Sequence, residues 1–389
     1  MMAPSTVLPR HPIVLAAGGT GGHIFPAEAL ARVLVSRGET VVLMTDARGQ
    51  AFGADLENVP VLRIRASWVR PGALGKLRTA IEIGRGMLQA RRLLKRMRPS
   101  VVVGFGGYPS IPTIFAAQRQ KFPILLHEQN AFAGRANRLL ARHADRIALS
   151  FPQTHGLPQD ARPHTVITGT PVRLAIAALA GKPYQPPKAP QAVNLLVLGG
   201  SQGARVFSDV VPAAMADLPD WLKPRMRVVQ QARPEDLERA QAGYAAAGVE
   251  AEVAPFFDDV PARLAAAHLA ITRSGASTCA ELTVAGRPAI LVPYPSAADD
   301  HQRFNAASLM RGGAGWLVPQ EDFTPQTLAA QLTDLIADTG RLAAAAKASA
   351  ALGLPDAAER LADAVQALAR GDATGDGGAR DGETMGAAA

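Results

Sequence analysis

Four glycines and a histidine follow the first apolar run of the chain, in the stretch GGTGGH at residues 18–23. Backbone N–H groups without side chains around them, placed just before a helix, favour the binding of a phosphate. Two further glycine loops also follow apolar runs, GFGGYPSIP at residues 104–112 and GGSQGA at residues 199–204. Three loops of this kind predict a protein that binds phosphorylated ligands.

The spacing of these glycines argues against two common nucleotide-binding motifs. None of the loops contains G-x-G-x-x-G, the motif of dinucleotide-binding domains, and the chain has no G-K-[ST] of an ATP-type phosphate loop. Asp46, at the end of the second predicted strand, could still imitate the ribose-binding acid of nicotinamide enzymes. A nicotinamide-dependent oxidoreductase therefore stays open as an alternative.

Short β-rich runs alternate with alanine- and leucine-rich helical stretches, a pattern typical of buried parallel strands. A proline-rich stretch, residues 181–191, separates five runs from the five that follow it. We therefore predict an α/β protein with two doubly wound, Rossmann-like domains, whose glycine loops face a cleft at the carboxyl ends of the strands. The runs lie at 13–17, 40–44, 100–104, 123–127, 146–150, 194–198, 226–230, 249–253, 269–272 and 288–293.

The composition fits a globular chain of two domains. Of the 389 residues, 48% are hydrophobic. The longest uncharged stretch, residues 99–118, contains glycines and prolines that argue against a membrane-spanning helix. The single cysteine, Cys279, excludes an internal disulfide and fits a reducing compartment such as the cytoplasm.

Positive charge is concentrated in one segment of the chain. Residues 63–98 hold eleven lysines and arginines against one acid, whereas the whole chain has a net charge of +8. Apolar residues recur at helical spacing over residues 83–97. The segment is interpreted either as a solvated surface helix or as a contact with an anionic membrane surface, with Trp68 and Leu74 entering the headgroup region. Nothing in its pattern supports nucleic acid as a partner.

Seven stretches together resemble a known family, the bacterial enzymes that add N-acetylglucosamine to undecaprenyl-pyrophosphoryl-N-acetylmuramyl-pentapeptide. The resemblance implies the two-domain GT-B fold, UDP-N-acetylglucosamine (UDP-GlcNAc) as donor, and inverting transfer to the C4 hydroxyl of the acceptor, which converts lipid I into lipid II in peptidoglycan synthesis. A UDP-sugar epimerase of the same fold is the nearest alternative. The stretches are GGTGGH (18–23), GFGGY (104–108), HEQNAFAGRANRLL (127–140), TGTPVR (168–173), GGSQGAR (199–205), TRSGASTCAEL (272–282) and DDHQRFNA (299–306).

The resemblance also implies how the chain is divided. Residues 1–172 form an acceptor and membrane-associating domain, residues 173–350 a donor domain, and residues 351–370 a helix that crosses back. The composition of residues 371–389, rich in glycine, aspartate and alanine, separately predicts a disordered tail. The protein is expected at the cytoplasmic face of the bacterial inner membrane, as a peripheral protein with other cell-wall synthesis proteins as further partners. No D-x-D motif occurs, so we expect no metal site and no cofactor.

The resemblance places the donor on the second domain. Helix N–H groups near Ser274 are expected to hold the diphosphate, and Glu281 the ribose hydroxyls. Arg173 adds a fixed positive charge for the departing UDP, and Phe257 lies beside the uracil. The predicted donor-binding residues are Asn130, Arg173, Ser201, Gln202, Gly203, Phe257, Ser274, Gly275, Ala276, Ser277, Thr278, Glu281, Gln302 and Asn305.

The acceptor is expected on the first domain. Thr20, Gly21 and Gly22, with Tyr108 from the second glycine loop, face the pyrophosphate of the lipid carrier. His23 is the candidate base for the acceptor hydroxyl, because the dipole at a helix start disfavours imidazolium and keeps the ring neutral. Glu128 is the rival base.

Overall fold

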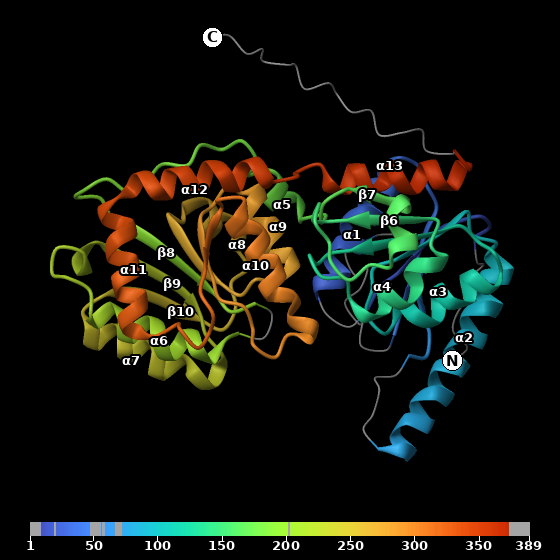
Figure 1. The fold of residues 1–389 in the computed structure, drawn as a ribbon, viewed down its shortest axis with the longest axis horizontal. Helices are drawn as coiled ribbons and strands as arrows, with labels where there is room; N and C mark the ends of the chain where they lie inside the picture. The colour runs from blue at the N-terminus through green and yellow to red at the C-terminus, as the bar shows by residue number, and fades with distance from the viewer. Residues whose placement is uncertain are drawn as a thin grey trace, which may run out of the picture.

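The computed structural model describes residues 9–18, 21–46, 56, 59–66, 72–200 and 203–372. Within them, two β-sheets lie side by side, and helices cover both faces of each sheet (Figure 1). Every described strand pair is parallel. The predicted fold class, two Rossmann-like domains of the GT-B type, is confirmed.

Strand β1 (Ile13–Ala16) shows why these runs are apolar throughout. Its side chains alternate between two cores: Val14 and Ala16 pack on one face of the sheet, whereas Ile13 and Leu15 pack on the other. Because both faces of the sheet are buried, a polar side chain on either face would be removed from water. The residues of the strand are therefore apolar on both faces.

The first sheet has seven strands in the order β3-β2-β1-β4-β5-β6-β7. Its other strands are β2 (Val41–Thr45), β3 (Val61–Arg63), β4 (Val101–Gly104), β5 (Ile124–Glu128), β6 (Arg146–Leu149) and β7 (Thr165–Ile167). Its helices are α1 (Gly21–Ser36), α2 (Ala73–Met97), α3 (Ser110–Arg119) and α4 (Arg135–Leu140), with 3-10 turns η1 (Ala141–His143) and η2 (Gln159–His164).

The second sheet has six strands in the order β10-β9-β8-β11-β12-β13. They are β8 (Val193–Leu198), β9 (Met226–Gln231), β10 (Glu250–Ala254), β11 (Leu269–Thr272), β12 (Ala289–Leu291) and β13 (Gly315–Leu317). The helices are α5 (Leu174–Ala177), α6 (Arg205–Ala216), α7 (Leu237–Ala247), α8 (Val260–Ala266), α9 (Ala276–Val284), α10 (His301–Arg311), α11 (Pro325–Ala337), α12 (Thr339–Leu352) and α13 (Ala357–Arg370), with 3-10 turns η3 (Lys223–Arg225), η4 (Pro234–Asp236) and η5 (Ala298–Asp300).

All ten predicted runs are strands, and the structure adds β3, β7 and β13. Each of the three added strands has three residues and lies at the edge of a sheet. An edge strand pairs on one side only, so it needs no long apolar run and leaves a weaker pattern in the sequence.

Helix α13 lies on the first domain, although it follows the second in the chain. Figure 1 shows α13 above α1, and Leu361 and Val365 of α13 belong to the same core as Leu30 of α1. Arg37 also donates a hydrogen bond to the Asp363 carboxylate at 2.7 Å. The end of the chain therefore completes the core of its first domain.

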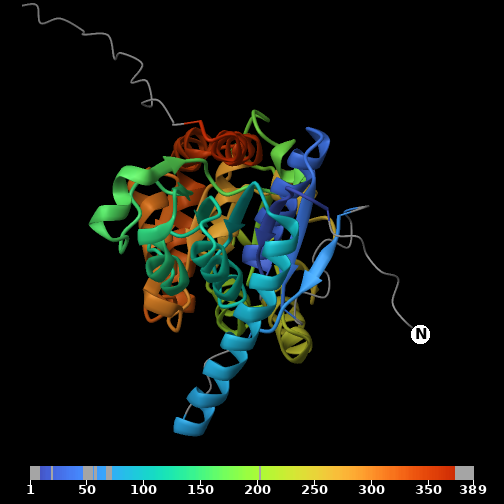
Figure 2. The same ribbon diagram turned by 90° about the vertical axis from the view of Figure 1, so that its right-hand side faces the viewer.

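Helix α2 extends away from the body of the first domain (Figure 2). Its carboxyl-terminal half packs inward through Ala90, Leu94 and Met97, which are fully buried. Arg98 ends the helix in the left-handed conformation, with φ at 49°. Within the described residues, no helix is long and apolar enough to cross a membrane.

Candidate active site

His23 is the third residue of α1 and lies against the glycine loop that follows β4. A Cβ on Gly107 would lie 3.3 Å from His23 Cδ2, and Gly107 has a positive φ of 73°. Burial lowers the pKa of His23, an effect that the charge of Glu128 opposes. The imidazole is therefore neutral near pH 7 and able to accept a proton. Its Nδ1 atom is buried, without a hydrogen-bond partner among the described residues.

The neighbours predicted around His23 are partly described. Gly21 and Gly22 form the first turn of α1, and Thr20 lies outside the described residues. Tyr108 is partly buried and lies beside Arg135. The pKa of Arg135 is raised mainly by its hydrogen bond to Asp299, and Tyr108 makes a minor contribution to this shift. The structure thus brings Tyr108 to the boundary between the two domains.

Glu128, the predicted rival base, is a buried carboxylate that holds its own loop together. Its Oε1 accepts from the backbone N–H of Asn130 at 2.9 Å, and its Oε2 accepts from the N–H of Gly134 at 2.9 Å and from Asn137 Nδ2 at 2.8 Å. Only 1% of Glu128 is exposed. With both oxygens already bonded to this loop, Glu128 is placed to shape it and not to take a substrate proton. The role of Glu128 as the rival base stays a prediction, which these hydrogen bonds disfavour.

His127 and Gln129 were not among the predicted site residues, although both lie in the HEQN stretch. The ring Nε2 of the buried His127 lies 2.9 Å from the carbonyl of Gly169 and donates to it, while Nδ1 accepts from Gln129 Nε2 at 3.0 Å. Burial lowers the pKa of His127 to about 4. A neutral histidine thus connects the end of β5 to the segment that leaves the first domain. The signal in the sequence was three consecutive polar residues at the end of an apolar strand.

The start of α9 has the features of an anion site. Gly275 precedes the helix in an extended conformation, and no side chain caps the helix N-terminus. Ser277 Oγ, in the first turn, is buried without a hydrogen-bond partner among the described residues. Ser274 is fully buried and donates to the carbonyl of Gln302 at 2.8 Å, which fixes the loop. Together with Ala276 and Thr278, these residues form the predicted diphosphate loop.

Arg173 and Glu281, predicted for different parts of the donor, form an ion pair with each other. Arg173 Nη2 lies 2.9 Å from Glu281 Oε1, and Arg173 Nε donates to the same oxygen at 3.1 Å. Burial raises the pKa of Glu281, and Arg173 opposes this shift. The pair fixes the guanidinium beside the middle of α9.

Asn305, which the resemblance implied to contact the sugar, already has several protein partners. It is fully buried, its Oδ1 accepts from the N–H of Ala131 at 2.8 Å, and its Nδ2 donates to Asn130 Oδ1 at 3.1 Å and to the Ser274 carbonyl at 3.0 Å. Protein groups thus use both Nδ2 hydrogens and one acceptor position of the amide, and the sugar contact stays a prediction. Asn305 joins the two domains. Gln302, one turn earlier, is partly buried and accepts from the N–H of Tyr294 at 2.9 Å.

An ion-pair cluster also crosses the domain boundary. Arg138 Nη2 lies 2.6 Å and Arg135 Nε 3.1 Å from Asp299 Oδ2. The rings of Phe132 and Phe304 contact each other nearby, with centroids 4.9 Å apart and planes tilted by 40°. The stretches HEQNAFAGRANR and DDHQRFN therefore face each other, which no local pattern in the sequence indicated.

Phe257, predicted beside the uracil, is buried. It is 7% exposed, and the Arg263 guanidinium lies 4.1 Å from the centre of its ring. The adjacent Phe256 is 68% exposed. Of the two side chains, only that of Phe256 presents an open surface to a ligand. Ser201 and Gln202 lie outside the described residues, whereas Gly203 is described, with φ at 67°.

Histidine, cysteine and acidic side chains do not gather into metal-binding groups of three or more in the parts of the chain that the structure describes. Cys279 is buried on α9, and burial raises the pKa of its thiol to about 12. The groups described around the proposed site are backbone N–H groups and the side chains of histidine, serine, arginine, glutamate and amide residues.

Comparisons with known proteins identify the family. Residues 13–149 match the glycosyltransferase family 28 N-terminal domain, and residues 194–361 match the family 28 C-terminal domain. A protein of Rhodospirillum centenum named UDP-N-acetylglucosamine–N-acetylmuramyl-(pentapeptide) pyrophosphoryl-undecaprenol N-acetylglucosamine transferase is 59% identical over 91% of this chain and 93% of its own. A protein of the same name from Granulibacter bethesdensis is 52% identical over 92% of this chain and 94% of its own.

Solved structures agree with this assignment. The crystal structure of Acinetobacter baumannii MurG superposes with a TM-score of 0.76 at 31% identity, over 92% of this chain and 99% of that one. A UDP-GlcNAc 2-epimerase of Neisseria meningitidis shares the fold alone, with a TM-score of 0.63 at 13% identity over 91% of this chain and 99% of its own. Its two domains, its sequence and its fold place the chain in glycosyltransferase family 28, among the pyrophosphoryl-undecaprenol N-acetylglucosamine transferases.

Proposed function

We propose that the protein transfers N-acetylglucosamine from UDP-GlcNAc to the C4 hydroxyl of undecaprenyl-pyrophosphoryl-N-acetylmuramyl-pentapeptide, with inversion at the anomeric carbon. The observation that carries this proposal is the 59% identity to a relative of that name over 91% of the chain. The epimerase alternative has support only at the level of the fold.

The test is a transfer assay with the full-length protein and labelled UDP-GlcNAc, with and without the lipid-linked acceptor. Label in a lipid-linked disaccharide, formed only when the acceptor is present, is the expected result. Release of UDP without a disaccharide product would overturn the proposal and favour the epimerase.

His23 is the general base of this proposal. The acceptor C4 oxygen attacks the anomeric carbon, the bond from that carbon to the β-phosphate oxygen breaks, and UDP leaves with the electron pair. The hydroxyl proton moves to the neutral imidazole of His23 and then to solvent. The lowered pKa of His23 and its place beside the Gly107 loop support this role.

The leaving UDP is stabilised by the second domain. Negative charge on the β-phosphate grows as the bond breaks, and N–H groups fixed in advance at the start of α9 stabilise that charge without reorganisation. Arg173 adds a cation that Glu281 already holds in place at 2.9 Å. Glu281 also accepts from the ribose hydroxyls, and Phe256, being exposed, replaces Phe257 as the residue beside the uracil.

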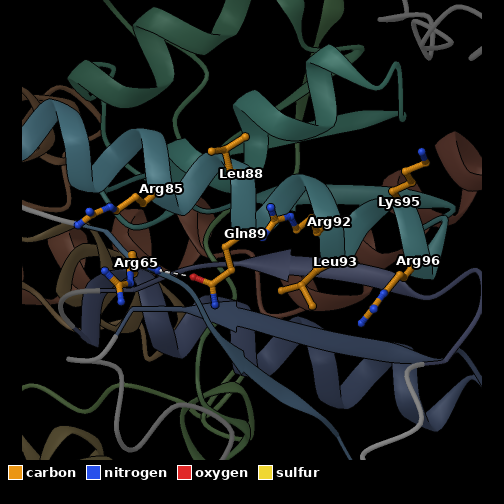
Figure 3. A pocket seen from close by; sticks show the side chains of 8 residues that line it. All are labelled: Arg65, Arg85, Leu88, Gln89, Arg92, Leu93, Lys95 and Arg96. Atoms are coloured by element: carbon orange, nitrogen blue, oxygen red, sulfur yellow. Dashed lines mark hydrogen bonds between the residues drawn. The ribbon is translucent and has the colours of Figure 1, made fainter.

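The basic face of α2 is the proposed membrane contact. Figure 3 shows Arg85, Arg92 and Arg96 along the helix, with Arg65 opposite Gln89, which accepts a hydrogen bond from the Arg65 backbone at 3.2 Å. Leu88, on the same helix, is 55% exposed. Apolar and cationic side chains together favour an anionic lipid surface. Trp68 and the side chain of Leu74 lie outside the described residues.

The orientation of the protein follows from its substrates. The proposed location is the cytoplasmic face of the inner membrane, where a peripheral protein would meet both a nucleotide sugar and a lipid-linked acceptor. The carrier pyrophosphate then meets the loops that contain Gly22 and Tyr108, on the same domain as α2. Other cell-wall synthesis proteins remain proposed partners.

A further inference from the structure

Arg233 lies between the two loops of the second domain that face the proposed donor. It follows β9, the neighbour of β8 in the sheet, and its side chain lies against Gly203 in the glycine loop. A Cβ on Gly203 would lie 2.8 Å from Arg233 Cγ and 3.4 Å from Arg233 N. The loop therefore needs glycine at this position both for its positive φ and to accommodate the arginine stem.

A second arginine, Arg273, lies close to Arg233 but already has three acceptors from the protein. Arg273 donates to the carbonyls of Val292 at 3.1 Å and Pro293 at 3.0 Å, and to Gln320 Oε1 at 2.6 Å. Burial lowers the pKa of Arg273 to about 10, and the positive charge of Arg233 adds to the shift. Two guanidinium groups thus lie at the carboxyl ends of the strands, and the hydrogen bonds of Arg273 stabilise the fold.

Arg233 itself lacks comparable partners among the described residues. Its Nε is buried without a hydrogen-bond partner there, and Nη1 lies 3.7 Å from Glu235 Oε1, on a side chain that is 65% exposed. A buried donor without an acceptor is unfavourable, and a nearby like charge adds to the cost. An anion bound between the two loops would accept a hydrogen bond from Arg233 and offset the repulsion between the two arginines.

We propose that Arg233 binds a phosphate group of the donor nucleotide's diphosphate. The proposal rests on the proposed function, because it takes the ligand to be a UDP-sugar. The guanidinium supplies a charge-assisted donor beside the glycine loop that contains Gly203. Arg233 thereby acts on the leaving group from the glycine-loop side.

Calorimetric titration of the full-length protein with UDP and with uridine tests this role. Arg233→Met keeps the stem beside Gly203 and removes the guanidinium. We expect it to weaken UDP binding by about tenfold, the size of one charge-assisted hydrogen bond, and to leave uridine binding unchanged. Arg227→Met is the matched control, because Arg227 lies at the other end of β9 with similar side-chain exposure, 41% against 38% for Arg233.

Unchanged UDP affinity in Arg233→Met would overturn the proposal, as would an equal loss for UDP and uridine, which would place Arg233 at the base. If Arg233→Met does not fold, Arg233→Gln takes its place under the same criteria. Failure of the wild-type protein to bind UDP would instead contradict the proposed function. The two failures are therefore distinguishable.

Discussion

At the scale of single residues, burial decides which predicted side chains are available for chemistry. His23 remains the proposed base, because burial lowers its pKa and its ring lies beside the Gly107 loop. Glu128 and Asn305 have the right chemical groups, but protein donors and acceptors already use them. The residue type indicated which chemistry each side chain could perform, whereas its hydrogen bonds in the fold determine whether its polar atoms are available to a substrate.

Replacing the proposed base removes proton transfer but not donor binding. His23→Ala should lower kcat by about 10²- to 10⁴-fold, the usual contribution of a positioned general base, and should leave the Kd for UDP unchanged. In the wild-type protein, kcat should fall on the acid side only below the ordinary histidine pKa of 6.5, because the pKa of His23 is lowered and the neutral form is active. Steady-state rates across pH and calorimetry with UDP measure both effects. Near-normal kcat in His23→Ala would exclude His23 as the base.

His127 should make stability depend on pH. Its folded-state pKa of about 4 lies below the unfolded value of 6.5, so the unfolded chain binds more protons between these values and stability falls as pH falls. The loss attributable to His127 between pH 7 and pH 5 is about 2 kcal/mol. Urea denaturation of the wild-type protein and of His127→Gln, each at pH 7 and at pH 5, measures the loss of stability that is due to His127. An identical pH dependence in the variant would contradict the assignment.

At the scale of elements, α2 combines a buried apolar face with a basic face, and the basic face is the proposed membrane contact. Ala90, Leu94 and Met97 bury one face of its carboxyl-terminal half, and the arginines occupy the other. The sequence predicted this helix and its charge. The amphipathic pattern by itself did not distinguish a solvated surface helix from a contact with an anionic membrane, because both have the same pattern.

Removing three charges from α2 should weaken membrane binding. Arg85→Gln, Arg92→Gln and Arg96→Gln together should lower partitioning onto anionic vesicles about 100-fold, from about 1 kcal/mol per charge. Sedimentation with phosphatidylglycerol vesicles measures this, with phosphatidylcholine vesicles as reference. The matched control replaces Arg311, Arg341 and Lys347, which are exposed on the second domain. Equal loss in both triple variants would show a general charge effect and no role for α2 as the membrane contact.

At the scale of the whole molecule, the contacts between domains assemble the proposed active site. Asn305 connects the Ser274 loop of the donor side to Asn130 of the acceptor side, and Asp299 receives two arginines from the first domain. Helix α13 strengthens the connection, since the chain returns to the first domain after completing the second. The relative position of the two domains is thus part of the site.

Asn305→Leu should loosen this arrangement. It leaves the N–H of Ala131 and the carbonyl of Ser274 without their partner, at a cost of about 1–3 kcal/mol for each unsatisfied buried group. We expect a larger radius of gyration in small-angle scattering and a kcat reduced by about tenfold or more. Loss of affinity for UDP-GlcNAc relative to UDP, at an unchanged radius, would instead support the predicted sugar contact.

Local pattern by itself determined the buried strands, the glycine loops and the two-domain architecture, because apolar periodicity and turn residues act between near neighbours. Only the tertiary structure decided which of Phe256 and Phe257 is exposed, since packing against Arg263 selects one of two adjacent rings. It alone also paired Arg173 with Glu281, 108 positions apart, and Asn130 with Asn305, 175 positions apart. Such pairs form where sheets and helices bring distant segments together, and the spacing of residues along the chain does not record them.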